Sequence, residues 1–164
     1  SFAYANRLLL GDGKNHFNPM DTTTRAMLVT VLWSMEQSPS AVGSAFADVP
    51  DGEWYAKAVS WAADNGIVSG YGNGLFGPND AVTREQMTVI LMNYAKYKGY
   101  DVSAFSDLDV FSDSTLVSSW ATSSMAWAHA EGIINGVGEG LIDPRGLAQR
   151  CQVATILHRF IMSY

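Results

Sequence analysis

Several features that mark other protein classes are missing from this sequence of 164 residues. It contains no run of 18 apolar residues, so no segment is predicted to span a membrane. The first residues carry no charged leader, and no signal peptide is predicted. The formal net charge of −6 argues against general nucleic-acid binding, because such binding relies on clustered lysine and arginine. The single cysteine excludes an internal disulfide bond.

Patterns typical of enzymes and metal sites are missing as well. The three histidines share no motif spacing, and no HExxH, GxSxG or P-loop pattern occurs. Asp107, Asp109 and Asp113 form an acidic run, but the glycine and the terminal glutamate of an EF-hand loop are absent. Loop solvation or helix capping explains these aspartates more simply than calcium does. We therefore expect no catalysis, no cofactor and no metal site.

The residues that are present indicate a folded domain. Hydrophobic residues make up 48% of the chain and charged residues 16%, a balance typical of globular proteins. The length suits one domain with its own core, so residues 1–164 are predicted to form a single module. Five tryptophans and seven tyrosines are many for this size, and such side chains pack in cores or lie against sugar rings.

One pattern occurs about three times along the chain. The fullest copy consists of Gly66, Ile67, Gly70, Phe76, Pro78, Thr83 and Arg84. A weaker copy lies 59 positions earlier and ends at Arg25, and a third lies 66 positions later and ends at Arg150. Self-similarity at such a period indicates several copies of one structural unit packed together.

The repeat sets the expected organisation of the module. We predict three repeats, at residues 1–40, 41–100 and 101–164. The first repeat is expected to be shortened at its start, because the counterpart of Phe46 would precede residue 1.

The segment after each repeated arginine is amphipathic with a helical period. Apolar residues recur at i, i+3, i+4 and i+7 in every copy, which is one face of a helix. The twelve positions are Leu28, Val31, Leu32, Met35, Met87, Ile90, Leu91, Tyr94, Val153, Ile156, Leu157 and Phe160. We predict three core helices, at roughly residues 22–37, 83–98 and 149–162, and therefore an all-α fold.

A second helix is predicted before the glycine loop in the second and third repeats. Helical spacing relates Trp54, Ala58, Trp61 and Ala62, and again Trp120, Ser124, Trp127 and Ala128. These helices are expected to begin near Trp54 and Trp120 and to stop at Gly66 and Gly132, because glycine favours the left-handed turn that ends a helix. The second tryptophan of each helix is predicted to lie in the core.

The combined pattern of the second repeat resembles the S-layer homology family. The residues that carry the resemblance are Phe46-Ala47-Asp48-Val49, Trp54, Gly66-Ile67-Val68-Ser69-Gly70, Phe76-Gly77-Pro78 and Thr83-Arg84-Glu85-Gln86. The resemblance covers nearly the whole chain, and the combination is specific although each piece alone is weak. It implies three repeats in a pseudo-threefold arrangement, with a central three-helix bundle and peripheral prongs of helix and loop.

The resemblance also implies a function. Members of the family attach surface proteins noncovalently to a secondary cell-wall polysaccharide, often one that bears a pyruvate ketal. The expected partner is therefore an anionic cell-wall glycan, bound in grooves between repeats, and the expected location is extracellular, at the bacterial cell wall. Other domains of a larger surface protein are further expected partners. The alternative is a structural or protein-binding helical repeat, which would expose apolar patches.

Arg84 is the leading candidate for binding an anion. Thr83 and Gln86 have the spacing of a capping box, which places Arg84 in the first turn of its helix. That end of a helix carries partial positive charge and free N–H groups, so an arginine there needs a carboxylate nearby. Glu85 is one candidate carboxylate and a ligand is the other, since the planar guanidinium matches a carboxylate.

Equivalent positions extend the candidate site. Arg25 is the counterpart of Arg84 in the first repeat, and Arg150 is the counterpart in the third, where the threonine cap and the acidic residue are missing. The glycine loops offer N–H donors and a polar side chain at Ser69-Gly70 and Asn135-Gly136. At Gly11, the matching position of the first repeat, the polar side chain is missing, and Lys14 adds positive charge. Tight turns are the more common reason for such glycines. By family analogy, Trp54 and Trp120 line the grooves, where a sugar face can lie against them.

Overall fold

The structure is a computed structural model that describes residues 18–43 and 46–164. Within these ranges it contains five α-helices, one short 3₁₀-helix and no β-strand. The elements are α2 (Arg25–Met35), α3 (Ala56–Asp64), α4 (Arg84–Tyr97), η1 (Ser114–Leu116), α5 (Thr122–Ala130) and α6 (Arg150–Ser163). The prediction of an all-α fold is confirmed.

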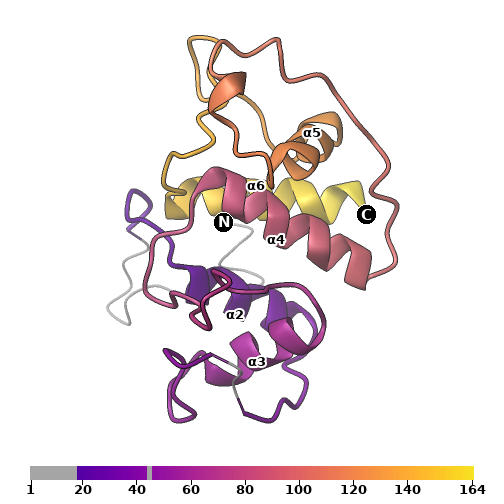
Figure 1. Ribbon diagram of the computed structural model, residues 1–164. Helices are drawn as coiled ribbons and strands as arrows, with labels where there is room; N and C mark the ends of the chain where they lie inside the picture. Colours follow the sequence, from indigo (N-terminus) through magenta and orange to yellow (C-terminus); the bar gives the residue numbers. More distant parts are fainter. Residues whose placement is uncertain (1–17, 44–45) are drawn as a thin grey trace.

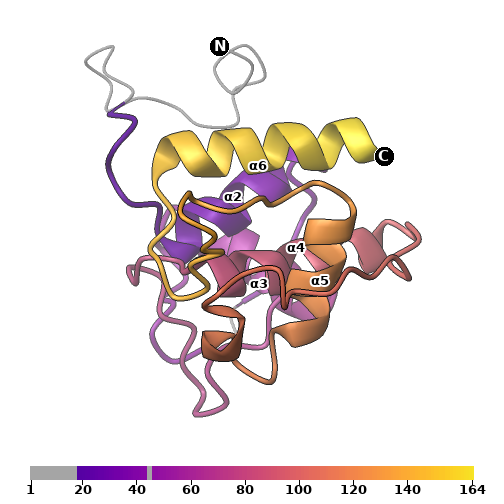
Figure 2. The same ribbon diagram turned by 90° about the horizontal axis from the view of Figure 1, so that it is seen from above.

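The helices α4 and α6 cross the middle of the molecule, with α2 and α3 on one side and α5 and η1 on the other (Figure 1). After a turn of 90°, α6 lies along one edge of the body (Figure 2). Among the described helices, none combines the length and the apolar character needed to cross a bilayer.

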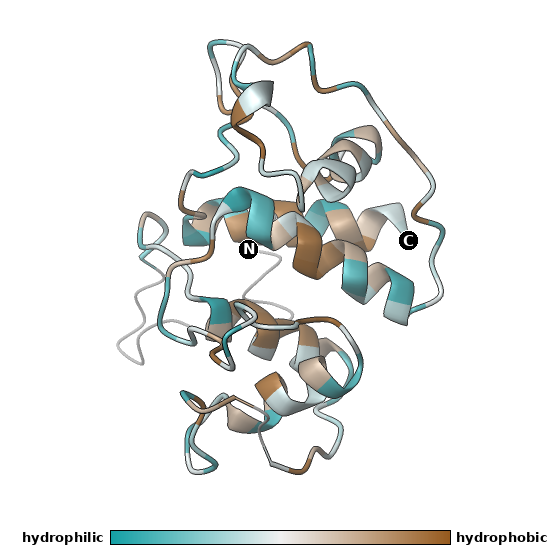
Figure 3. Cartoon of the chain, in the orientation of Figure 1, coloured by the Kyte–Doolittle hydropathy of each residue, from teal (hydrophilic) through white to brown (hydrophobic). Residues whose placement is uncertain are grey.

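The three core helices carry the predicted apolar stripes. Eleven of the twelve stripe positions are buried, and Met35 is partly buried against them, which confirms the helical period read from the sequence. Hydrophobic and hydrophilic residues alternate along these helices, as expected for amphipathic helices (Figure 3). The helices meet at Tyr94 of α4, whose ring centroid lies 5.7 Å from that of Phe160 in α6. The Tyr94 hydroxyl donates to Glu36 directly after α2, and Lys98 donates to the same carboxylate.

Each core helix begins at its repeated arginine. Thr24 caps α2 by accepting a hydrogen bond from a backbone N–H of the first turn. Thr83 and Gln86 form the predicted capping box at the start of α4. At the start of α6, Gln149 stands in place of threonine, and its N–H donates to the side chain of Gln152 at 3.1 Å.

The extended residues just before the three core helices form a closed ring of backbone hydrogen bonds. The N–H of Thr23 donates to the carbonyl of Ala148, that of Ala148 to Val82, and that of Val82 to Thr23, each at 2.9 Å. All three residues are fully buried and occupy equivalent positions of the three repeats. Because these residues are extended, α2 begins three residues later than predicted. A pseudo-threefold arrangement requires such a cyclic order, but the arrangement of whole repeats stays a prediction.

The outer helices α3 and α5 end as predicted. Gly66 and Gly132 adopt φ of 68° and 67°, and the following residue of each donates back into the last turn, which is the Schellman arrangement. Trp61 and Trp127 are buried, as predicted.

The expected starts of the outer helices are wrong. Trp54 and Trp120 precede α3 and α5 by two residues and lie in turns rather than in the helices. Their side chains therefore escape the core and are 59% and 58% exposed.

Candidate functional site

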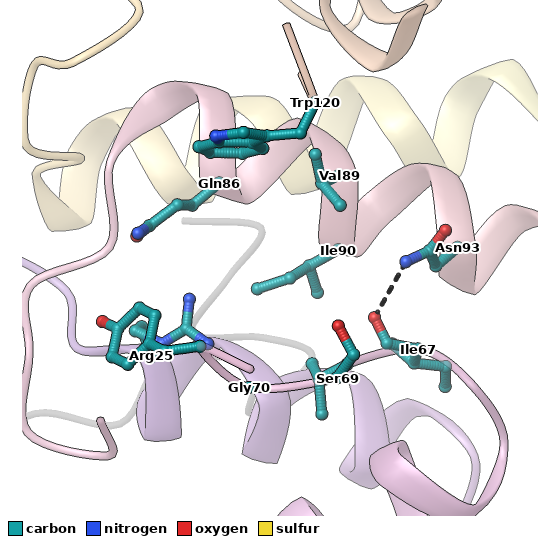
Figure 4. A pocket seen from close by; sticks show the side chains of 11 residues that line it. Arg25, Ile67, Ser69, Gly70, Gln86, Val89, Ile90, Asn93 and Trp120 are labelled. Carbon is teal, nitrogen blue, oxygen red and sulfur yellow. Dashed lines mark hydrogen bonds between the residues drawn. The ribbon is translucent and has the colours of Figure 1, made fainter. Parts of the chain in front are cut away.

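A groove lies between the start of α2, the glycine turn at residues 69–71 and α4, and its volume is about 410 Å³. Arg25, Ser69 and Gly70 line one side and face Gln86 and Trp120 on the other (Figure 4). We call this cavity the Arg25 groove. It combines one arginine from the first repeat, a turn and helix from the second, and a tryptophan from the third.

Arg25 is held in place by backbone and aromatic groups rather than by a carboxylate. It is 6% exposed, and its Nε donates to the carbonyl of Phe76 at 2.8 Å. The guanidinium carbon lies 4.6 Å from the ring centroid of Tyr71 and 4.8 Å from that of Phe76. Among the described residues, no salt bridge and no acceptor for its two terminal nitrogens is found. Burial lowers the pKa of Arg25, and the nearby Tyr71, Asp80 and Asp48 oppose this effect. Arginine stays protonated in proteins, so the groove holds a charge for which the described residues form no salt bridge.

The second and third repeats share a set of contacts that fixes the loop to which the arginine donates. The carboxylate of Asp48 accepts hydrogen bonds from the N–H groups of Phe76 and Gly77 at 2.8 and 2.7 Å. Burial acts to raise the pKa of Asp48, but these bonds outweigh it and hold the pKa below its ordinary value. In the next repeat, Asp113 accepts from Ile142 and Asp143 at 2.9 and 2.8 Å. The aspartate therefore secures one face of the loop and the arginine the other.

A second groove of about 280 Å³ lies beside α6 and is built in the same way. Arg84 is 4% exposed, and its Nε donates to the carbonyl of Ile142 at 2.9 Å. One terminal nitrogen donates to the carbonyl of Asn135 at 2.8 Å, and Gly136 and Gln152 line the same cavity. We call this cavity the Arg84 groove.

Glu85 does not form an ion pair with Arg84. Of the two carboxylates considered from the sequence, the one within the chain is therefore excluded. Glu85 is buried and accepts hydrogen bonds from the N–H and the hydroxyl of Ser118, both at 2.9 Å. It thus joins the start of α4 to the turn before α5.

The first N–H groups of the core helices are also committed. In each case they donate to carbonyl groups in the loop of another repeat. In α2, Arg25 donates to Asp80 and Ala26 to Pro78. In α4, Arg84 donates to Gly146 and Glu85 to Pro144, and in α6, Arg150 donates to Asp21 and Cys151 to Pro19. The expectation that these groups stay free for a ligand is therefore wrong. The turn residues Ser69, Gly70, Asn135 and Gly136 differ, since among the described residues their N–H groups have no acceptor.

The glycines of the two turns are required for packing. A Cβ atom at Gly70 would lie 2.5 Å from the carbonyl oxygen of Leu75 and 2.6 Å from the ring of Phe46. At Gly136 the matching distances, to Leu141 and Phe111, are 2.9 and 3.0 Å. Gly70 also has a φ of 68°, so its turn geometry demands glycine independently of any ligand.

Other predicted site residues are not brought together. Arg150 is half-buried and Trp54 is exposed, and neither belongs to the described lining of the two grooves. Gly11 and Lys14, predicted for the first repeat, lie outside the described residues. The acidic run is divided among turns, with Asp113 on its loop, and no group of three potential metal ligands occurs among the described residues.

Sequence reasoning missed part of each groove wall. Gln86 and Asn93 line the Arg25 groove, and Gln152 and Arg159 take the matching positions in the Arg84 groove. The repeat spacing could have identified these residues, because Gln152 and Arg159 lie 66 positions after Gln86 and Asn93.

Comparisons with known proteins agree with this architecture. The model of the S-layer homology domain matches residues 45–88 and 110–154. The chain is 33% identical over 159 residues to "Exoglucanase XynX" of Acetivibrio thermocellus, covering 94% of this chain and 14% of that protein. It is 32% identical over 159 residues to "Amylopullulanase" of Thermoanaerobacterium thermosulfurigenes, covering 94% of this chain and 8% of that protein.

A relative without an enzyme name shows the same coverage. The "Surface-layer 125 kDa protein" of Lysinibacillus sphaericus is 29% identical over 157 residues, which cover 94% of this chain and 13% of that protein. The chain thus spans a small part of each relative. Matched by the family model over more than half of its length, the chain belongs to the S-layer homology domain family, whose members are noncatalytic anchoring modules of S-layer and other cell-surface proteins.

Proposed function

We propose that this module anchors a larger bacterial surface protein by binding an anionic secondary cell-wall polysaccharide, such as a pyruvylated one, in the Arg25 and Arg84 grooves. The observation that carries the proposal is the environment of Arg25. Its guanidinium group is buried, has no salt bridge among the described residues, and borders an open cavity with an aromatic wall. A ligand carboxylate is the group that such a site accommodates, because charge-assisted bonds to guanidinium are strong in partly buried positions.

The rest of the Arg25 groove suits a sugar ring. Trp120 offers an exposed apolar face, and burying a sugar's C–H surface against it contributes roughly 25 cal/mol per Å². Ser69, Gln86 and Asn93 add polar groups around the same cavity. A single groove of this kind supports binding in the micromolar range, near −8 kcal/mol. A polymer that occupies both grooves gains further affinity through multivalency.

The protein-binding alternative predicts exposed apolar patches rather than an arginine beside an aromatic wall in a groove. A concave cavity that pairs a buried cation with one aromatic wall is the arrangement expected of a glycan site instead. This geometry is why we favour the glycan over a protein partner.

Cosedimentation with purified cell walls, before and after their secondary polymers are stripped, tests the proposal. Trp120→Ala is the decisive variant, because a side chain that is 58% exposed can be removed with little effect on folding. We expect it to weaken binding to intact walls by about tenfold, equivalent to ~1.4 kcal/mol. The matched control is Phe105→Ala, which removes an aromatic side chain that is 73% exposed and lies outside both grooves.

Arg25→Lys provides a second test. Lysine keeps the charge but loses the planar fork, so weaker binding at an unchanged melting temperature supports a direct contact. Equal sedimentation with stripped and intact walls, or a Trp120→Ala variant that binds as well as the parent chain, would refute the proposal.

A further inference from the structure

The two grooves share one plan but differ in charge. Four of the residues that line the Arg25 groove on α4 are Gln86, Val89, Ile90 and Asn93, and their counterparts on α6 are Gln152, Thr155, Ile156 and Arg159. Asn93 is neutral and donates to the carbonyl of Ile67 at 3.2 Å, so it is part of the wall. Its replacement by Arg159 gives the Arg84 groove a second guanidinium group.

Arg159 lies close enough to act electrostatically on Arg84. It is half-buried, and it shares one face of α6 with Gln152, Thr155 and Ile156, because these positions follow helical spacing. Burial is the main cause that lowers the pKa of Arg84, and the positive charge of Arg159 adds to it, whereas Asp143 and Asp113 oppose it.

Among the described residues, no carboxylate forms a salt bridge with Arg84 or Arg159. Among the described residues that line the Arg84 groove there is no aspartate or glutamate, and the side chain of Arg159 has no described salt-bridge partner. Asp113 is occupied by the N–H groups of Ile142 and Asp143. Two like charges at one cavity oppose folding unless an anion joins them, so a ligand with more than one negative charge gains most there.

The aromatic surface changes in the opposite direction. The Arg25 groove has Tyr71 under its guanidinium and Trp120 as a wall, whereas Val137 takes the position of Tyr71 in the Arg84 groove. The Arg25 groove therefore combines one charge with stacking, and the Arg84 groove depends mainly on charge.

We propose that the Arg84 groove selects a doubly charged acidic group on the glycan, of the phosphate-monoester kind, while the Arg25 groove binds a singly charged acid against its aromatic wall. The inference rests on the proposed function, since it assumes that both grooves receive acidic saccharides. One module would then bind two different acidic groups along a polymer. Arg159 is the residue that makes the two grooves differ in this preference.

NMR titration of the 164-residue chain separates the two grooves, because the N–H signals of Gly70 and Gly136 report on them individually. The probes are glucuronate, glucose 6-phosphate, and the methyl ester of glucose 6-phosphate, which has the same sugar with one charge fewer. At Gly136 we expect glucose 6-phosphate to bind about tenfold more tightly than either singly charged probe, as one extra charge-assisted contact allows. At Gly70 we expect no such preference.

Exchanging the differing residue provides the matched variants. Arg159→Asn should remove the preference at Gly136, and Asn93→Arg should create one at Gly70. Arg145→Asn is the control, because Arg145 is exposed and outside both grooves, so it removes the same charge without changing either preference. Preserved dispersion of the other amide signals shows that a variant is folded.

The outcomes separate this inference from the proposed function. If Gly70 responds to glucuronate while Gly136 binds all three probes equally, the proposed function survives and the selectivity is overturned. A preference that persists in Arg159→Asn also overturns it. If neither glycine responds to any acid, the proposed function itself fails.

Discussion

Replacing Gly70 with alanine tests the packing on which the Arg25 groove is built. A Cβ atom there would lie 2.5 Å from the carbonyl oxygen of Leu75 and 2.6 Å from a ring carbon of Phe46, well inside van der Waals contact. Gly72 is an internal reference in the same turn, because its φ of 82° has the same sign and no atom lies within 4 Å of its would-be Cβ. The difference between the two variants therefore isolates packing from backbone conformation.

The expected magnitudes follow from these geometries. Placing a side chain at positive φ costs roughly 1 kcal/mol, which is the whole effect anticipated for Gly72→Ala. Gly70→Ala adds an overpacking cost of about 1–3 kcal/mol, since the obstructing atoms include a backbone carbonyl that cannot rotate away. The total loss of unfolding free energy is about 2–4 kcal/mol, which lowers the melting temperature by several degrees.

Urea unfolding followed by tryptophan fluorescence measures both variants. Gly52→Ala is the neutral control, because Gly52 has neither positive φ nor neighbouring atoms. If Gly70→Ala destabilises the chain no more than Gly72→Ala does, Gly70 does not pack closely against Leu75 and Phe46. The shape of the Arg25 groove described above would then be refuted as well.

Three further measurements address the remaining contacts. Arg84→Ala should destabilise the fold by about 2–4 kcal/mol in thermal unfolding, because two loop carbonyls lose a charged donor, whereas exposed Arg145→Ala should change stability by under ~0.5 kcal/mol. The pKa of Asp48 is held below its ordinary value, so its contribution to stability is present above about pH 4 and is lost as the pH falls through the lowered pKa. Asp48→Asn should therefore reduce the dependence of the free energy of unfolding on pH in this acidic range. An unchanged dependence on pH would contradict the loop contact. Tyr94→Phe should cost about 1–1.5 kcal/mol by chemical unfolding, since Glu36 loses one of its two donors, and a neutral result would argue against this link between α2 and α4.

The parts of the fold set by local chemistry were predictable from the sequence. The apolar stripe from Met87 to Tyr94 has a helical period, and burying this stripe in the core stabilises α4. The capping box of Thr83 and Gln86, which are three residues apart, fixes the start of α4. Gly66 ends α3 for the equally local reason that its φ is positive.

Features set by contacts between repeats could not be predicted in the same way. Glu85 was one of the two carboxylates considered for Arg84, but Arg84 donates to the carbonyls of Ile142 and Asn135, which lie more than 50 positions away in the chain. Glu85 likewise turns to Ser118 instead of its neighbour. The residues of the first turn of α4 give no indication of these distant partners. An arginine next to a glutamate in the sequence therefore does not show that the two form an ion pair. The offset between repeats relates Asn93 to Arg159, but the sequence analysis did not use it to find these parts of the groove walls.

The buried ring through Thr23, Val82 and Ala148 makes the three repeats depend on one another. Each link joins a different pair of repeats, so deleting one repeat leaves a donor in one neighbour and an acceptor in the other without partners. A lone repeat also cannot make the Arg25 groove, which takes side chains from three. The ring and the Arg25 groove therefore both require all three repeats in one chain.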